Sequence, residues 1–119
     1  MEIEWPSGTP DYDILGIGPG REIRIEIKFS TLWRTGVYKF QQLRDQPYDL
    51  LLCLGLSPQE AHLWTFPKSE ALWYATPQHG GKEGKDTYWL SLSPRELQKY
   101  KDYGGKLEDG IEKMVQHFK

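Results

Sequence analysis

The sequence has 119 residues, a mass of 13.9 kDa and a net charge of −2, which predicts one domain because two halves would each be too small to fold stably. Its content of 38% hydrophobic and 13% aromatic residues excludes a fully disordered chain. The slightly negative charge argues against a protein that coats nucleic acid by charge alone.

The first half of the chain predicts two strands, a helix and a buried strand. The two strands cover residues 12–18 and 21–30 and are joined by the turn sequence Gly18-Pro19-Gly20. Apolar and charged residues alternate along the second strand, as expected for a half-buried strand. A helix is predicted over Val37 to Gln46, where Pro47 ends it, and the apolar run over 48–54 predicts a strand buried on both faces.

The second half continues with a strand over 61–66, a short helix over 67–74, a polar Gly-rich loop over 77–86 and a strand over 87–92. Ser93, followed by proline and, three residues on, by glutamate, predicts the start of a helix that Gly104-Gly105 interrupts. A second amphipathic helix is predicted within 107–118. The order β-β-α-β-β-α-β-α indicates an α/β domain over 1–119, with a mixed sheet flanked by helices.

The sequence shows no membrane span, no secretory signal, no possible internal disulfide and no pattern of a structural zinc site. The longest apolar run, Leu50 to Leu54, is too short to span a bilayer, and residues 1–4 do not begin a secretory signal. The single Cys53 excludes an internal disulfide, and three scattered histidines make a structural zinc site improbable. We therefore expect a soluble cytoplasmic protein without a membrane partner.

The turn between the first two strands determines which charged residues face each other. If Pro19-Gly20 is a two-residue hairpin loop, Asp13 faces Glu26 and Asp11 faces Lys28. Opposed carboxylates destabilise a sheet unless a positive charge lies between them, and Mg²⁺ binds a few carboxylates together with water and phosphate oxygens. The alternative is an ordinary solvated charged face, and a one-residue shift in register would separate the carboxylates.

The segment Pro10-Asp11-Tyr12-Asp13, followed by Glu26-Ile27-Lys28 in a strand, resembles the motif of the PD-(D/E)xK nuclease superfamily, which includes restriction endonucleases and Holliday-junction resolvases. The resemblance implies a restriction-endonuclease-like fold. It also implies that Asp13, Glu26 and the Ile27 carbonyl hold Mg²⁺, which Mn²⁺ could replace, and that Lys28 orients or activates the attacking water. Asp13 is favoured over Asp11 because it opens an apolar strand.

The family core places a helix and two strands after this motif, an order that 36–66 is predicted to supply. It also usually begins with a helix, yet only ten residues precede Asp11. Three interpretations stay open: Glu2 or Glu4 replaces the acidic residue of that helix, the C-terminal helices take its layer, or the chain is a fragment.

Nucleic-acid contacts are predicted beside this site. Family members often place a glutamine or a basic residue on the helix after the motif, which implies Gln41 or Gln42 together with Lys39 or Arg44. The alternative is an exposed helical face. Arg34 is a candidate phosphate contact, whereas Trp33 is expected to pack rather than to stack on a base. Lys82 and Lys85, in the polar loop, are candidates to follow a DNA backbone, although Glu83 and Asp86 cancel their charge.

The function predicted from the sequence is therefore that of a Mg²⁺-dependent DNA endonuclease that hydrolyses phosphodiester bonds. A homodimer would bring two sites to two strands, and a separate specificity domain or subunit fits the small size. Three alternatives stay open: a Holliday-junction resolvase-like nuclease, a non-catalytic nucleic-acid-binding domain of the same fold, and a general α/β interaction module. RNA also stays open as the substrate.

Overall fold

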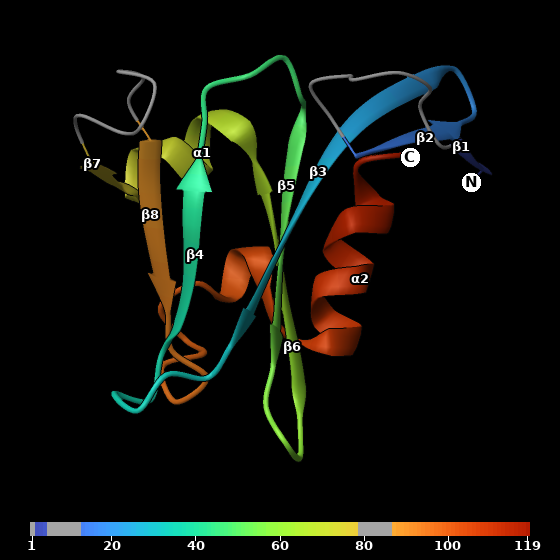
Figure 1. Ribbon diagram of the computed structural model, residues 1–119. Coiled ribbons are helices and arrows are strands. Elements are labelled where there is room, and N and C mark those ends of the chain that lie inside the picture. Colours follow the sequence, from blue (N-terminus) through green and yellow to red (C-terminus); the bar gives the residue numbers. More distant parts are fainter. Residues whose placement is uncertain (1, 5–12, 79–86) are drawn as a thin grey trace.

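The computed structural model describes residues 2–4, 13–78 and 87–119, and in this part of the chain two β-sheets pack face to face beside a C-terminal helix (Figure 1). The larger sheet has the strand order β1-β2-β3-β5-β6-β9 and the smaller one the order β4-β8-β7. The larger sheet comprises β1 (Glu2–Glu4), β2 (Ile14–Gly18), β3 (Arg21–Thr31), β5 (Leu50–Leu56), β6 (Ala61–Pro67) and β9 (Gly104–Lys106). The smaller sheet comprises β4 (Tyr38–Leu43), β7 (Thr76–Gln78) and β8 (Thr87–Leu92), and the helices are α1 (Lys68–Tyr74), the single-turn η1 (Lys101–Tyr103) and α2 (Leu107–Gln116). The chain is thus a mixed α/β domain.

Strand β3 forms as its alternating residues predict. Ile23 and Ile25 are buried against α2, while Glu26 and Lys28 lie on the opposite face of the sheet. The strand pairs antiparallel with β2 and parallel with β5, so the larger sheet is mixed. A parallel pair needs a long connection between its strands, and here that connection contains β4.

The helix predicted over Val37 to Gln46 is wrong, because this segment contains strand β4. Tyr38 and Phe40 are fully buried between the sheets, whereas Lys39 and Gln41 point away from that core. This period of two is the pattern of a strand. The helix-favouring Lys, Gln and Arg residues suggested a helix, but the burial of alternating aromatic side chains determines the structure.

The helix predicted from Ser93 is also absent, because residues 93–103 form successive turns that end in η1. The Ser93 hydroxyl does accept a hydrogen bond from the Arg95 amide, at 3.1 Å. The chain then remains irregular, since Leu97, Tyr100 and Tyr103 pack against the core between the sheets. Helix α2 confirms the second amphipathic segment, and the other predicted strands and the helix over 67–74 are confirmed within a few residues.

Two apolar cores lie on the two faces of the larger sheet. One lies between the sheets and includes Tyr38, Trp64 and Phe66. The other lies between the larger sheet and α2, where Phe118 packs against Gly16. No helix in the described ranges has the length and apolar character needed to cross a lipid bilayer.

The close contact between the two sheets leaves no room for a side chain at Gly55 in β5. A methyl group at this position would lie 2.6 Å from the ring of Tyr38, which is fully buried. We expect Gly55→Ala to lower the free energy of unfolding by about 2 kcal/mol, because the ring cannot move away in a close-packed core. Leu56→Ala, at the exposed next residue, should change it by less than about 1 kcal/mol in the same urea denaturation experiment. Equal effects of the two substitutions would contradict this packing.

Candidate active site

A pocket lies where strands β3 and β4 diverge. The strands are held together at one end, where the Lys39 amide donates a hydrogen bond to the Ser30 hydroxyl at 3.0 Å and Leu32 bridges to Tyr38. From there β4 runs away from β3 along the edge of the smaller sheet (Figure 1). The space between them is a pocket of about 180 Å³, which we call the β3–β4 pocket. Its lining residues are Glu26, Lys28, Gln42, Leu43, Arg44, Gln46 and Tyr48.

The polar floor of this pocket comes from the register between β3 and β5. Glu26 pairs with Leu51 and Lys28 pairs with Cys53, so all four side chains lie on the face of the larger sheet that meets the smaller sheet. Leu51 and Cys53 are covered by the smaller sheet and fully buried, whereas Glu26 and Lys28 are only half-buried. The two charged side chains therefore lie where the smaller sheet stops covering this face.

The β2–β3 hairpin confirms the predicted register, with Gly18 opposite Arg21 and Leu15 opposite Arg24. At Asp13 the regular pairing ends, because its amide donates at 2.9 Å to the carbonyl of Ile25, which already lies opposite Ile14. One oxygen of the Asp13 carboxylate accepts a hydrogen bond from the Ile27 amide at 2.8 Å. Asp13 is thereby fixed at the end of β2, beside Glu26. Asp11 lies outside the described residues, so its predicted position opposite Lys28 stays a prediction.

The environment of Glu26 raises the pKa of its carboxyl group to about 7. Burial is the largest cause, followed by the hydrogen bond to Asp13 and the negative charge of Asp13, while the ammonium of Lys28 has a smaller opposing effect. Two carboxyl groups that share a site cannot both ionise easily. Near neutral pH the Glu26 carboxyl is therefore only partly ionised.

The residues present fit a divalent cation. The pKa of Glu26 is raised first by burial and then by Asp13, and a cation beside the two carboxyl groups would favour the ionised form of Glu26 against both effects. The Ile27 carbonyl can add a third oxygen, because the amide of this residue faces Asp13 and a residue's N–H and C=O point to the same edge of a strand. The described residues contain no cluster of three His, Cys, Asp or Glu side chains that could hold a metal ion. Such a site suits Mg²⁺, which usually keeps several waters and binds substrate phosphates.

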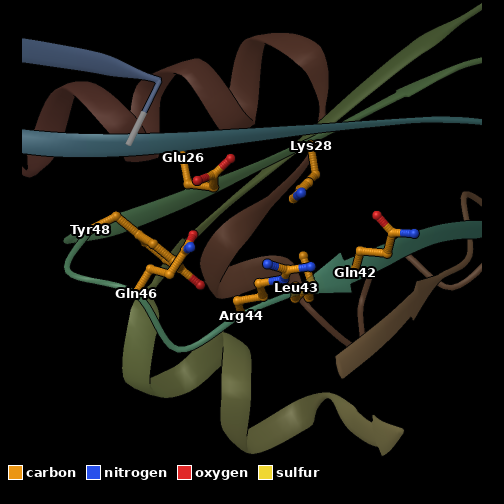
Figure 2. Close-up of a pocket in the computed structure, with 7 residues that line it drawn as sticks. All are labelled: Glu26, Lys28, Gln42, Leu43, Arg44, Gln46 and Tyr48. Atoms are coloured by element: carbon orange, nitrogen blue, oxygen red, sulfur yellow. The ribbon is translucent and has the colours of Figure 1, made fainter. Parts of the chain in front are cut away.

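Figure 2 shows Glu26 and Lys28 extending from β3 towards the opposite wall of the pocket, which carries Gln42 and Arg44. Gln42 is held there by a β-bulge. Phe40 pairs with Leu90 and Leu43 pairs with Tyr88, so two residues of β4 lie opposite Trp89 alone. Regular alternation would place Gln42 on the buried face together with Phe40, but the bulge moves it out and returns Leu43 to the core.

The bulge requires an unusual backbone conformation at Gln42, whose φ is +57°. Left-handed backbone is uncommon for residues other than glycine, and it persists where the surrounding structure imposes it, often at functional sites. Of the two alternatives from the sequence, Gln42 lines the pocket, whereas the exposed Gln41 does not.

Sequence reasoning missed Tyr48, which it assigned to a buried strand, and Gln46. The Tyr48 side chain is almost fully buried, yet its hydroxyl has no hydrogen-bond partner among the described residues. Burial, together with the negative charge of Glu26, raises the pKa of this phenol. A buried hydroxyl normally has a partner, and the Tyr48 side chain forms part of the pocket wall, so this hydroxyl is available to a polar group in the pocket. The signal that could have identified Tyr48 from the sequence is its polar hydroxyl, on the residue that directly follows Pro47 at the start of the strand predicted to be buried.

The segment that carries Gln46 and Tyr48 is held by contacts on both sides. The Lys68 ammonium donates to the Gln46 carbonyl at 2.9 Å and lies 3.1 Å from the Asp45 carboxylate. The Asp49 carboxylate accepts hydrogen bonds from the Arg24 guanidinium at 3.3 Å and from the Arg24 amide at 2.8 Å. Burial would raise the pKa of Asp49, but these bonds and the charge of Arg24 lower it. These contacts tie the pocket wall to α1 and β3.

Only some of the remaining residues predicted to bind nucleic acid lie in the pocket. Arg44 lines the pocket, but Arg34 and Lys39 do not. Lys39 lies near the closed end of the divergence between the strands, with its ammonium 4.4 Å from the centre of the Trp33 ring. Lys82 and Lys85 fall outside the described residues.

Comparison of the chain with protein-family models, with curated proteins and with solved structures gives no match. The interpretation of the site therefore depends on its own geometry and on the sequence motif.

The raised pKa of Glu26 predicts how stability changes with pH. An ordinary glutamate titrates near 4.5 and this one near 7, so the folded state binds more protons than the unfolded state between these values. Stability contributed by Glu26 is thus fully present below pH 4.5 and is lost as the pH rises through 7. We expect Glu26→Gln to be about 1 kcal/mol more stable than the unmodified chain at pH 8, after allowing for solvent screening, and to show a smaller loss of stability between pH 5 and 8.

Urea denaturation in EDTA at several pH values measures both curves. Parallel stability curves for the two proteins would contradict the shifted pKa of Glu26.

Proposed function

We propose that this chain is a metal-dependent endonuclease of the PD-(D/E)xK type that hydrolyses phosphodiester bonds in DNA. The observation that carries the proposal is the juxtaposition of Asp13 and Glu26, together with the pocket that Glu26 and Lys28 line opposite a polar wall; Asp13 itself lies beside this pocket. The paired carboxyl groups suit a divalent cation, and the ammonium suits a phosphate or the attacking water.

The arrangement of the strands supports the proposal in part. The Glu-x-Lys segment lies in a central strand of a mixed sheet, and a hairpin brings the aspartate to it. The segment after this strand is β4 rather than the helix that the family core suggests. Helix α2 packs on the other face of the sheet, through β6, which favours the interpretation that a C-terminal helix takes the layer of the family's first helix.

The polar groups in and beside the pocket have the following roles under this proposal. Asp13, Glu26 and the Ile27 carbonyl would hold Mg²⁺, which when bound polarises the phosphate and offsets charge on the leaving oxygen. Lys28 has three N–H donors and no acceptor while protonated. It therefore holds the attacking water and a phosphate oxygen in place rather than removing a proton.

The opposite wall supplies further donors. The amide of Gln42 and the guanidinium of Arg44 can donate hydrogen bonds to non-bridging phosphate oxygens. The Tyr48 hydroxyl can hold a water molecule beside Glu26. In the hydrolysis the water oxygen bonds to phosphorus and the bond from phosphorus to the leaving oxygen breaks. The water gives up a proton to solvent, the leaving oxygen takes one from solvent, and the pocket holds the reacting atoms in line.

A homodimer and a separate specificity subunit stay predictions. The exposed Phe29 and Leu56 lie on the α2 side of the larger sheet, in line with the buried Ile25 and Leu52. Sedimentation of the purified chain measures its oligomeric state directly.

The proposal predicts metal-dependent cleavage that needs Lys28. We expect the chain to nick or linearise plasmid DNA with Mg²⁺ or Mn²⁺ and not with EDTA, and Lys28→Ala to lower the rate at least 100-fold. Lys101→Ala, which removes an exposed lysine that does not line the pocket, should cleave at the normal rate.

A four-way junction and a single-stranded RNA serve as further substrates in the same assay. Selective cutting of the junction would favour the resolvase-like alternative. Cutting of RNA alone would show that the substrate is RNA rather than DNA. No cleavage of any substrate by folded protein would contradict the nuclease proposal.

The bulge at Gln42 predicts opposite effects of one substitution on stability and on activity. Gln42→Gly should raise the free energy of unfolding by up to about 1 kcal/mol, because glycine adopts a positive φ without strain. The same substitution removes the amide from the pocket and should lower the cleavage rate at least 10-fold. Gln41→Ala, at the exposed neighbour in the same bulge, is the control and should keep the normal rate. Loss of activity in both variants would assign the effect to the bulge rather than to the Gln42 amide.

A further inference from the structure

Two tryptophan rings and one lysine, of which Trp33 is exposed and Lys39 and Trp89 are half-buried, form a group near the closed end of the divergence between β3 and β4. The Lys39 ammonium lies 4.4 Å from the ring centre of Trp33 and 5.6 Å from that of Trp89. Trp33, in the connection between the two strands, is 41% exposed. The larger part of the Trp33 side chain is thus covered by its neighbours, and the rest of the indole stays accessible.

Two arginines extend this group into a basic surface. Arg34 is adjacent to Trp33 and exposed, and the guanidinium carbon of Arg95 would lie 3.9 Å from a methyl group added at Gly36 in the same connection. Arg34, Lys39 and Arg95 form no ion pair with the residues that the structure describes. We call these residues the aromatic–basic cluster: Trp33, Arg34, Lys39, Trp89 and Arg95.

The chemistry of this cluster fits a ligand that carries both negative charge and flat rings. Uncompensated lysine and arginine side chains attract phosphates, and an exposed indole ring offers a surface on which a base can stack. In a duplex the base faces are already covered by neighbouring bases. The exposed ring is therefore best used by an unpaired nucleotide.

The cluster is close enough to the candidate active site for one nucleic-acid strand to contact both. Trp33 follows Lys28 by five residues along β3 and the start of the next connection, which corresponds to roughly 16 Å of extended chain. A nucleic-acid strand in the β3–β4 pocket can thus reach the cluster within a few nucleotides.

We propose that the aromatic–basic cluster binds an unpaired nucleotide next to the cleavage point, with the base stacked on Trp33 and the adjacent phosphates held by Lys39 and the two arginines. The proposal rests on the proposed nuclease function and makes it more specific. The preferred substrate is a nucleic acid with single-stranded or distorted segments, rather than a fully paired duplex.

The test measures binding apart from cleavage. Fluorescence anisotropy in EDTA gives the affinity of the full chain for a labelled single-stranded oligonucleotide and for the same sequence as a duplex. We expect Trp33→Ala to weaken single-strand binding about tenfold and duplex binding less than twofold. Lys39→Gln should reduce the slope of log affinity against log salt for the single strand by about 0.7, the value for one phosphate contact.

Two matched variants control for unspecific effects. Trp73→Ala removes an indole that is 83% exposed on α1, and Lys99→Gln removes a lysine that lies 5.4 Å from the ring of Tyr100. Both should bind like the unmodified chain.

An unchanged single-strand affinity in Trp33→Ala, or an equal loss in Trp73→Ala, would overturn the proposed role of the cluster. A larger loss for the duplex than for the single strand would also overturn it. These failures are separate from failure of the nuclease proposal, which would appear as no metal-dependent cleavage by the unmodified chain.

Discussion

The repulsion between Asp13 and Glu26 is the constraint on which the candidate site depends. The β2–β3 hairpin brings the two carboxyl groups together at the end of β2, and burial raises the pKa of Glu26 to about 7. A shift by one residue would relieve the repulsion, but it would also turn Ile23 and Ile25 out of the core beneath α2. The hydrophobic pattern of β3 thus holds the carboxyl groups together. Their proximity destabilises the fold when both are ionised, and a bound cation would offset this destabilisation.

The open surface around this pair results from incomplete coverage of β3. Helix α2 packs on one face of the larger sheet, and the smaller sheet covers β5 and β6 on the other face. Because β4 diverges from β3, the segment with Glu26 and Lys28 stays accessible (Figure 2). The bulge at Gln42 and the contacts of Lys68 then direct polar groups into the space that remains. The polar pocket is therefore a feature of the packing of the two sheets.

The sequence predicted the floor of the site better than its wall. The register of the hairpin follows from a two-residue turn and alternating isoleucines, which are local signals, so the pairing of β2 with β3 and the shared face of Glu26 and Lys28 could be predicted. The wall depends on β4, where lysine, glutamine and arginine favour a helix locally. Its conformation is decided by Tyr38 and Phe40, which become buried only when the two sheets meet.

The bulge at Gln42 and the unpaired hydroxyl of Tyr48 are also products of tertiary packing. No local pattern in the sequence specifies either of them. The choice between Gln41 and Gln42 could therefore be made only from the structure.

Binding of a divalent cation to the Asp13–Glu26 pair is the central claim, and titration calorimetry with Mg²⁺ or Mn²⁺ at pH 7.5 tests it most directly. We expect binding to one site per chain with release of a fraction of a proton, because the Glu26 carboxyl, with a pKa of about 7, is partly protonated at pH 7.5. Asp13→Asn should abolish this binding, while Asp109→Asn on the exposed surface of α2 should not change it. Absence of binding by the folded chain, or equal binding by Asp13→Asn, would contradict the account.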